Sequence, residues 1–156
     1  IPFRDPARSR AEIAELRANL AAPVWRALEI RLSNSPDAAA ALSGLTGLLH
    51  RHPALFPHFL SSPAAQSYLV AVGSYSRFLM AEIVEHPDWL QELMDKGDLH
   101  RARSAEELVA MLEAETDPGV PSALPLARFR RRQLLRVLLR DVLGLGTLAE
   151  ITGELS

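Results

Sequence analysis

The sequence predicts an all-α protein, an irregular bundle of several helices, and three observations support this class. Apolar residues recur at helical spacing along most of the chain, as in Ile13, Leu16 and Leu20. β-branched residues are scarce, and no long stretch alternates apolar with polar residues as a half-buried strand would. Residues typical of helix starts occur at short intervals. We therefore expect helices of about 8–20 residues joined by short turns.

The first 34 residues are expected to form N-terminal helices. Ser9-Arg10-Ala11-Glu12 has the spacing of a capping box, in which the first and last side chains bond each other's backbone N–H groups. It precedes Ile13, so we expect a helix to begin there. Pro23 suits the first turn of a second helix, where the missing N–H of proline is not needed.

Residues 35–115 are expected to form the central helices. Serine can cap a free helix start with its hydroxyl group, and proline fits the first helical turn. Ser104-Ala105-Glu106-Glu107 has the spacing of another capping box. The other predicted starts are Ser35-Pro36, Pro53, Pro63 and either Ser74 or Ser76, and Pro87 interrupts the chain after them.

Residues 116–125 are expected to be a loop, because proline and glycine gather between Asp117 and Leu124. Residues 126–156 should contain a long basic helix and a terminal helix, the latter capped by Thr147 with Glu150. We expect residues 1–156 to form a single helical domain.

The aromatic residues are expected to anchor the core, because each buries a large apolar area. For Trp89, a position at a partner interface is the alternative. These residues are Trp25, Tyr75, Phe78, Trp89 and Phe129.

The composition limits the kinds of site that the chain can hold. It has no cysteine, which excludes disulfides and thiolate metal sites and is compatible with a cytoplasmic protein. The net charge of −2 gives no overall attraction to nucleic acid, and no apolar run is long enough for a transmembrane helix. The five histidines lack the spacing of metal ligands, and no phosphate-binding glycine motif occurs. We expect no catalytic, cofactor-binding or metal-binding residue, and neither nucleic acid nor a membrane as a partner.

The strongest candidate site is a row of arginines on the predicted basic helix. Six arginines fall between Arg128 and Arg140 with no acid among them, and four of these recur at every fourth residue. On a helix this spacing produces a cationic stripe. The stripe could contact a phosphate or a docking surface, because guanidinium groups match phosphate and carboxylate geometry. The alternative is a solvated face with intramolecular ion pairs. The four residues are Arg128, Arg132, Arg136 and Arg140.

Residues 126–156 read LARFRRRQLLRVLLRDVLGLGTLAEITGELS, and Gly73 to Leu79 and His86 to Leu90 form two further motifs upstream. Together these segments resemble the helical segment ahead of the first catalytic domain in bifunctional glutamine synthetase adenylyltransferase/adenylyl-removing enzymes. The Arg-Arg-Arg run and the Glu-Leu-Ser ending favour that segment over the related one ahead of the second catalytic domain. Minor departures are Ala127, Gln133 and Val137. The similar residues are Phe129 to Arg132, Leu135-Arg136, Arg140-Asp141, Leu143-Gly144-Leu145 and Glu154-Leu155-Ser156, with Gly73 to Leu79, Glu82 and His86 to Leu90 upstream.

The resemblance covers about residues 40–156 and implies that the chain is a fragment of a larger multidomain enzyme. Such enzymes attach AMP from ATP to a tyrosine of glutamine synthetase and remove it by phosphorolysis, which releases ADP. Mg²⁺ would serve both reactions, and the PII signal protein would select the direction. In the family, an Asp-x-Asp motif holds the metal, and this sequence has none. We therefore expect the fragment to be inactive and to support and dock the downstream adenylyl-removing domain. The alternative is a helical adaptor module unrelated to nucleotidyl transfer.

Overall fold

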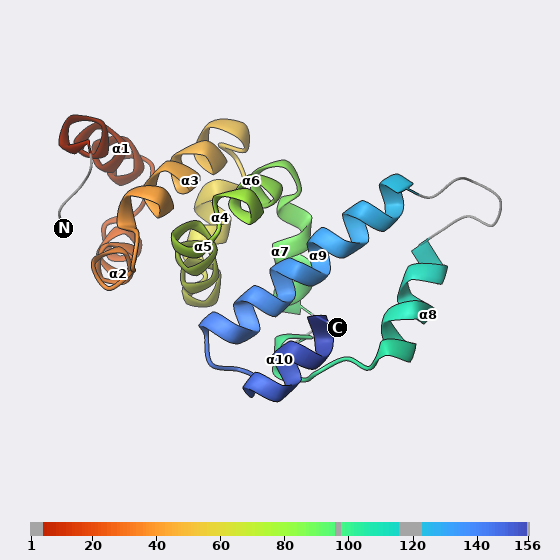
Figure 1. The fold of residues 1–156 in the computed structure, drawn as a ribbon. Coiled ribbons are helices and arrows are strands. Elements are labelled where there is room, and N and C mark those ends of the chain that lie inside the picture. The colour runs from red at the N-terminus through yellow and green to blue at the C-terminus, as the bar shows by residue number, and fades with distance from the viewer. Residues whose placement is uncertain (1–4, 96–97, 116–122, 156) are drawn as a thin grey trace. The chain divides into compact units, whose positions relative to one another are not determined.

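The computed structural model describes residues 5–95, 98–115 and 123–155, and the regular structure of these residues is entirely helical (Figure 1). The all-α prediction is confirmed. The chain divides into two compact units, residues 1–94 and 95–156. This division differs from the predicted boundaries after residues 34, 115 and 125, and the single domain that we expected stays a prediction.

The first unit is built around α3 (Ala38–Arg51), which contacts α1, α2, α5 and α6. The buried side of α3 carries alanines, which let neighbouring helices approach closely, and leucines, which fill the core. The most extensive of these contacts is with α5. The other helices are α1 (Pro6–Ala18), α2 (Ala22–Ser33), α4 (Phe56–Ser61), α5 (Pro63–Tyr75), α6 (Arg77–Glu85) and α7 (Pro87–Asp95).

Two predicted helix starts are wrong because aspartates provide the caps instead of serines. Asp5 begins α1 by accepting hydrogen bonds from the N–H groups of Ala7 and Arg8, both at 3.1 Å. Ser9 therefore lies inside the helix, where it is buried. Asp37 begins α3 by accepting from the N–H of Ala40 at 3.0 Å, in place of the predicted start at Ser35-Pro36. In both places an aspartate carboxylate, which caps a helix about as well as a serine hydroxyl does, occupies the position at which the helix begins.

Proline and serine mark most of the other starts as predicted. Pro23 lies in the first turn of α2, Pro63 begins α5, and Ser76 caps α6 by accepting from the N–H of Leu79 at 3.2 Å. The prediction for Pro53 is wrong, because the chain turns there and α4 begins only at Phe56.

Three of the five predicted aromatic anchors are confirmed, since Trp25, Trp89 and Phe129 are buried. The prediction is wrong for Tyr75 and Phe78, which are 57% and 53% exposed. These two residues flank the junction between α5 and α6, where a new helix direction begins at Ser76. The aliphatic residues of α6 fill the core in their place: Leu79, Met80 and Ile83.

The second unit contains the short 3₁₀ helix η1 (Asp98–His100) and the helices α8 (Ala105–Glu115), α9 (Ala123–Val142) and α10 (Leu148–Leu155). The two capping boxes predicted for this part of the chain are confirmed. Ser104 and Glu107 exchange backbone bonds at 2.9 and 3.2 Å, and Thr147 and Glu150 do so at 2.8 and 3.3 Å.

Helix α9 begins three residues earlier than expected. It starts at Ala123, so the end of the predicted 116–125 loop is helical, and Pro125 is tolerated because it lies in the first turn. Residues 116–122 lie outside the described residues. The helix ends where Gly144 adopts a φ of 65°, a conformation that favours glycine, while the Leu145 N–H bonds the Arg140 carbonyl at 2.8 Å.

The close crossing of α3 and α5 depends on Gly73. A Cβ at this position would lie 2.9 Å from the Cα of Ala41, so the two backbones would have to separate. We expect Gly73→Ala to lower the free energy of unfolding by about 1–3 kcal/mol, measured by urea denaturation. The matched control is Gly47→Ala in α3, whose Cβ would meet its nearest atom, Val84 Cγ2, at 3.8 Å. The control should raise stability by about 0.5–1 kcal/mol, because alanine is the better helix former. An equal loss in both variants would contradict this explanation.

Candidate functional site

The structure places the four arginines of the predicted stripe in different environments. Arg136 and Arg140 are each 1% exposed, Arg132 is partly buried, and Arg128 is exposed. Residues four apart on a helix are offset by about 40°, so over three steps the row turns by roughly 120°. The stripe therefore runs from the surface into the interior of the second unit. A phosphate or docking contact by Arg128 or Arg132 stays a prediction.

Arg136 ties α9 to two other segments. Its Nε donates to the carbonyl of Asp98 at 3.0 Å, its Nη1 donates to Glu154 Oε2 at 2.6 Å, and its Nη2 donates to the carbonyl of Arg101. Burial lowers the pKa of Arg136 below its ordinary value, and the bond to Glu154 opposes that effect. The whole guanidinium fork is thus used by internal acceptors.

Arg140 makes a second set of links one helical turn further on. Its Nη1 donates to the carbonyl of Leu99 at 3.1 Å, and its Nη2 donates to Glu150 Oε2 at 3.3 Å. Its Nε lies 3.7 Å from Glu154 Oε1, close enough for an ion pair but without a hydrogen-bond partner. Gly146 provides the room, because a Cβ there would lie 2.9 Å from Arg140 Nη2.

Glu154 of α10 is the centre of this group of charges. Besides the contacts with Arg136 and Arg140, its Oε1 accepts from the backbone N–H of Arg103 at 3.0 Å, and its side chain is 3% exposed. The side chain of Arg103 in turn pairs with Asp98 and donates to Gln133 at 2.9 Å. We call these six residues the arginine–carboxylate cluster: Arg103, Arg136 and Arg140 with Asp98, Glu150 and Glu154.

The cluster balances three guanidinium groups with three carboxylates, so it has no excess charge to attract an anion. Its buried arginines bind backbone carbonyls and internal acids. For Arg136 and Arg140, this geometry favours the interpretation as intramolecular ion pairs. The sequence pattern identified the arginines but not Glu154 as their shared partner, since nothing local marks a contact between residues 103 and 154.

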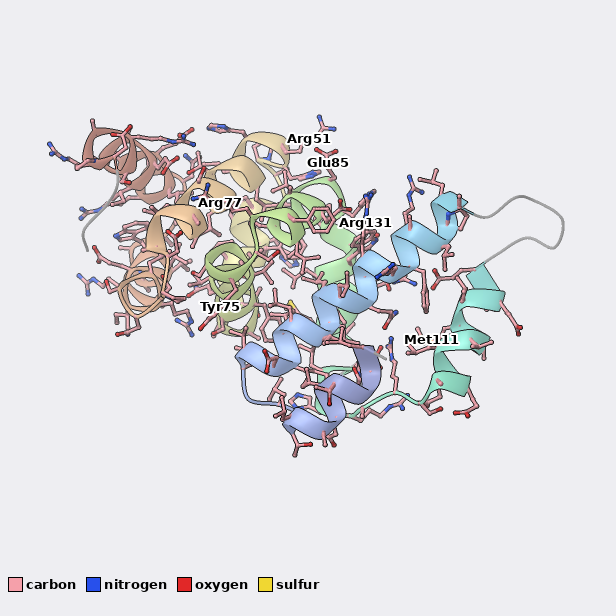
Figure 2. The ribbon with its side chains drawn as sticks, in the orientation of Figure 1. Arg51, Tyr75, Arg77, Glu85, Met111 and Arg131 are labelled. Carbon is pink, nitrogen blue, oxygen red and sulfur yellow. The ribbon has the colours of Figure 1, made fainter. Side chains whose placement is uncertain are left out.

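The arginines in the first half of α9 are more exposed than Arg136 and Arg140 in its second half. Arg128 and Arg130 are exposed, while Arg132 pairs with Glu115 of α8 and lies 5.9 Å from the centre of the Phe129 ring. Figure 2 shows Arg131 on the same stretch of α9. Of the four arginines in the predicted stripe, Arg128 is the one that is exposed.

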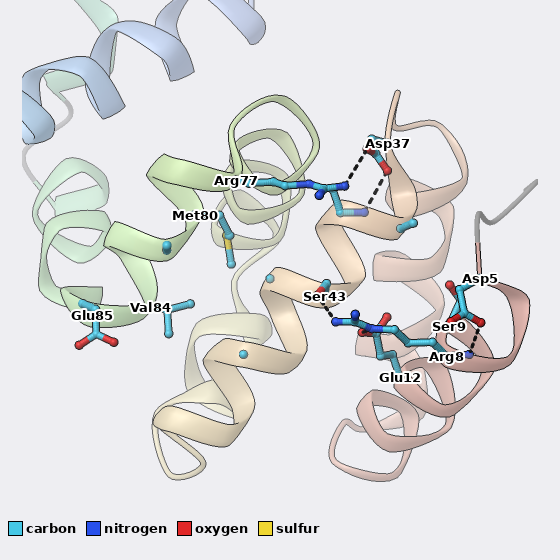
Figure 3. Close-up of a pocket in the computed structure, with 15 residues that line it drawn as sticks. Asp5, Arg8, Ser9, Glu12, Asp37, Ser43, Arg77, Met80, Val84 and Glu85 are labelled. Carbon is cyan, nitrogen blue, oxygen red and sulfur yellow. Dashed lines mark hydrogen bonds and ion pairs between the residues drawn. The ribbon is translucent and has the colours of Figure 1, made fainter.

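A second candidate site is a pocket of about 560 Å³ in the first unit, between α1, α3 and α6. Figure 3 shows Arg8 and Glu12 of α1 on one side, Met80, Val84 and Glu85 of α6 on the other, and α3 between them. Arg8 donates from Nε to Glu12 and from Nη2 to Ser43 Oγ, both at 2.9 Å. No pattern in the sequence predicted this pocket, although small residues recur along α3.

The described residues hold no group of three or more potential metal ligands, and none of their helices is long and apolar enough to cross a membrane. The histidines have structural contacts. His50 lies 2.6 Å from Glu15, His52 lies 2.7 Å from the carbonyl of Val84, and His86 stacks on Trp89 with ring centres 4.6 Å apart.

The structure is that of a helical segment in which buried ion pairs between arginines and carboxylates join residues 98–103, α9 and α10. Comparison with known proteins then gives its family. The model of the glutamate-ammonia ligase adenylyltransferase family matches residues 66–156, and the chain belongs to this family. The resemblance noted in the sequence is confirmed.

A curated relative from Chromobacterium violaceum, a bifunctional glutamine synthetase adenylyltransferase/adenylyl-removing enzyme, is 28% identical over 130 residues. The match covers 81% of this chain and 14% of the relative. The chain therefore spans a small part of the length of this relative. No solved structure matches the chain.

Substitution of the buried Arg136 and of the exposed Arg128 tests whether the arginine–carboxylate cluster stabilises the second unit. Arg136→Met leaves Glu154 buried without its closest charge partner, so we expect the free energy of unfolding to fall by about 3–5 kcal/mol. Arg128→Met, the exposed control on the same helix, should change it by less than about 0.5 kcal/mol. The free energy of unfolding of each variant is to be measured by urea denaturation of the purified chain. Equal effects at the two positions would show that the cluster does not stabilise the unit.

Proposed function

We propose that this chain is the non-catalytic helical portion of an enzyme that adds AMP to a tyrosine of glutamine synthetase and removes it by phosphorolysis. Its own role is to support and dock the adenylyl-removing catalytic domain. The observation that carries the proposal is the family match over α9 and α10, the same helices that the arginine–carboxylate cluster joins.

The acidic residues of the chain favour a non-catalytic role. Nucleotidyl transfer needs a metal held by paired carboxylates near the reacting phosphate. The 156 residues contain no Asp-x-Asp motif, and three of the acids in the second unit are engaged with buried or partly buried arginines. These acids position helices, and they are poorly placed to bind Mg²⁺.

The proposal assigns the remaining components to the longer enzyme. ATP, ADP and Mg²⁺ would bind its catalytic domains, glutamine synthetase would be its substrate, and the PII signal protein would select the direction of the reaction. The proposed location is the cytoplasm. The adaptor alternative receives no support from the family match, which joins the chain to an adenylyltransferase.

The docking role predicts an unequal effect on the two activities of the longer enzyme. Glu154→Gln weakens the attachment of α10 to α9, so we expect phosphorolytic release of AMP to slow more than adenylylation does. The measurement is both rates on glutamine synthetase, with Arg128→Gln as the exposed control on α9.

The isolated 156-residue chain is the second control, and it should neither add nor release AMP. Turnover by the pure chain would overturn the assignment as a non-catalytic portion. Equal slowing of both activities by Glu154→Gln would count against a role specific to the adenylyl-removing domain.

A further inference from the structure

Two of the three carboxylates in the arginine–carboxylate cluster belong to α10, which lies beside α9 (Figure 1). They are Glu150 and Glu154, whereas the three arginines are on α9 and on the segment before α8. The third carboxylate, Asp98, is in η1. Movement of α10 away from α9 would therefore remove two negative charges together and leave three guanidinium groups with one carboxylate. The charge balance of the cluster thus depends on one short helix.

Helix α10 has little apart from these charges to hold it in place. It has eight residues, of which Ile151 is the buried one. Leu148 and Leu155 are 78% and 57% exposed. Gly153 weakens the helix, and a Cβ there would meet no atom of the described residues within 4 Å. Because so short a helix is unstable alone in water, we expect α10 to open locally before the rest of the second unit unfolds.

The Glu154 carboxylate is held in the way that proteins hold a bound oxyanion. Its Oε2 accepts from Arg136 Nη1 at 2.6 Å, and its Oε1 accepts from the backbone N–H of Arg103 at 3.0 Å. Its side chain is 3% exposed, so these bonds are shielded from water. Guanidinium forks bind phosphate with the same geometry as carboxylate. The donors around Glu154 therefore suit a phosphate group as well.

One donor in this group is unused in the closed arrangement. Arg140 Nε is buried and lies 3.7 Å from Glu154 Oε1, and it has no hydrogen-bond partner within the described part of the chain. A buried donor of a charged group that lacks a partner is costly. A carboxylate has two oxygens, whereas a phosphate group presents at least three. A phosphate group can therefore use the donor that the carboxylate leaves unsatisfied.

The two buried arginines also have anchors that do not belong to α10. Arg136 Nε donates to the carbonyl of Asp98 at 3.0 Å, and Arg140 Nη1 donates to the carbonyl of Leu99 at 3.1 Å. Both acceptors are in η1. These bonds do not depend on α10, so they hold the two guanidinium groups side by side when α10 leaves.

We propose that these donors form an oxyanion-binding site, that Glu154 is its internal ligand, and that release of α10 opens the site to a phosphate group. In the closed form the cluster is electrically balanced and excludes anions. In the open form Arg136, Arg140 and the Arg103 N–H bind the phosphate oxygens. The proposal does not rest on the proposed function, because it concerns binding by the purified chain.

The first test removes the internal ligand. Glu154→Ala leaves Arg136 and Arg140 without their shared carboxylate, so inorganic phosphate should raise the melting temperature of this variant more than chloride does at the same ionic strength. The expected difference is about 2–4 °C. The wild-type chain in the same two buffers gives the general effect of phosphate on stability. Asp141→Ala, which removes an exposed acid of α9, is the matched control and should gain no more than the wild type.

The double variant Arg136→Met/Glu154→Leu tests whether the gain requires the guanidinium group, and it should gain no more than the wild type. An equal gain in this variant and in Glu154→Ala, or no gain in either, would overturn the site. ADP in place of inorganic phosphate distinguishes the two sources of the phosphate group. A larger gain with ADP assigns the site to a nucleotide phosphate, and an equal or smaller gain assigns it to free phosphate.

The second test needs no substitution, so it decides the proposal even where Glu154→Ala does not fold. Hydrogen exchange of the α10 amides in the wild-type chain is compared in phosphate and in chloride at the same ionic strength. Phosphate at twice its dissociation constant from the open form should speed this exchange about threefold. Exchange in α3, which belongs to the other unit, should not change. Equal exchange of α10 in the two salts would overturn the proposal, because the helix would then respond to ionic strength alone.

Discussion

The second unit depends on the buried ion pair between Arg136 and Glu154. Removing two charges from water costs several kcal/mol each unless every donor and acceptor finds a partner. Here the partners come from three segments that are distant in the sequence: residues 98–103, α9 and α10. Helix α10 has a single buried residue, Ile151, so apolar burial alone does not fix its position. The charges determine where the helix lies, and breaking one of them leaves the others uncompensated.

Local patterns predicted much of the fold, because helix starts depend on neighbouring residues. The capping boxes at Ser104 and Thr147 and the prolines at α2 and α5 are examples. Local patterns failed where the choice depends on distant residues. Burial of Tyr75 and Phe78 was predicted from side-chain type, but the change of direction at Ser76 leaves both exposed.

The candidate site shows the same limit. The spacing of Arg128, Arg132, Arg136 and Arg140 predicted one cationic surface, yet the helical drift of the row turns its second half toward Glu150 and Glu154. Only the tertiary contacts reveal which arginines are internal. The pocket beside α3 was not predicted for a related reason, since its lining residues come from α1, α3 and α6, which only the tertiary fold brings together.

The most direct measurement is a double-mutant cycle for Arg136→Met and Glu154→Leu, with the free energy of unfolding obtained from urea denaturation of each variant. If the buried pair holds the unit together, the two substitutions are strongly coupled. The double variant should then be more stable than the sum of the single losses predicts, by about 2–3 kcal/mol. Losses that add to within about 0.5 kcal/mol would contradict the central role of this ion pair.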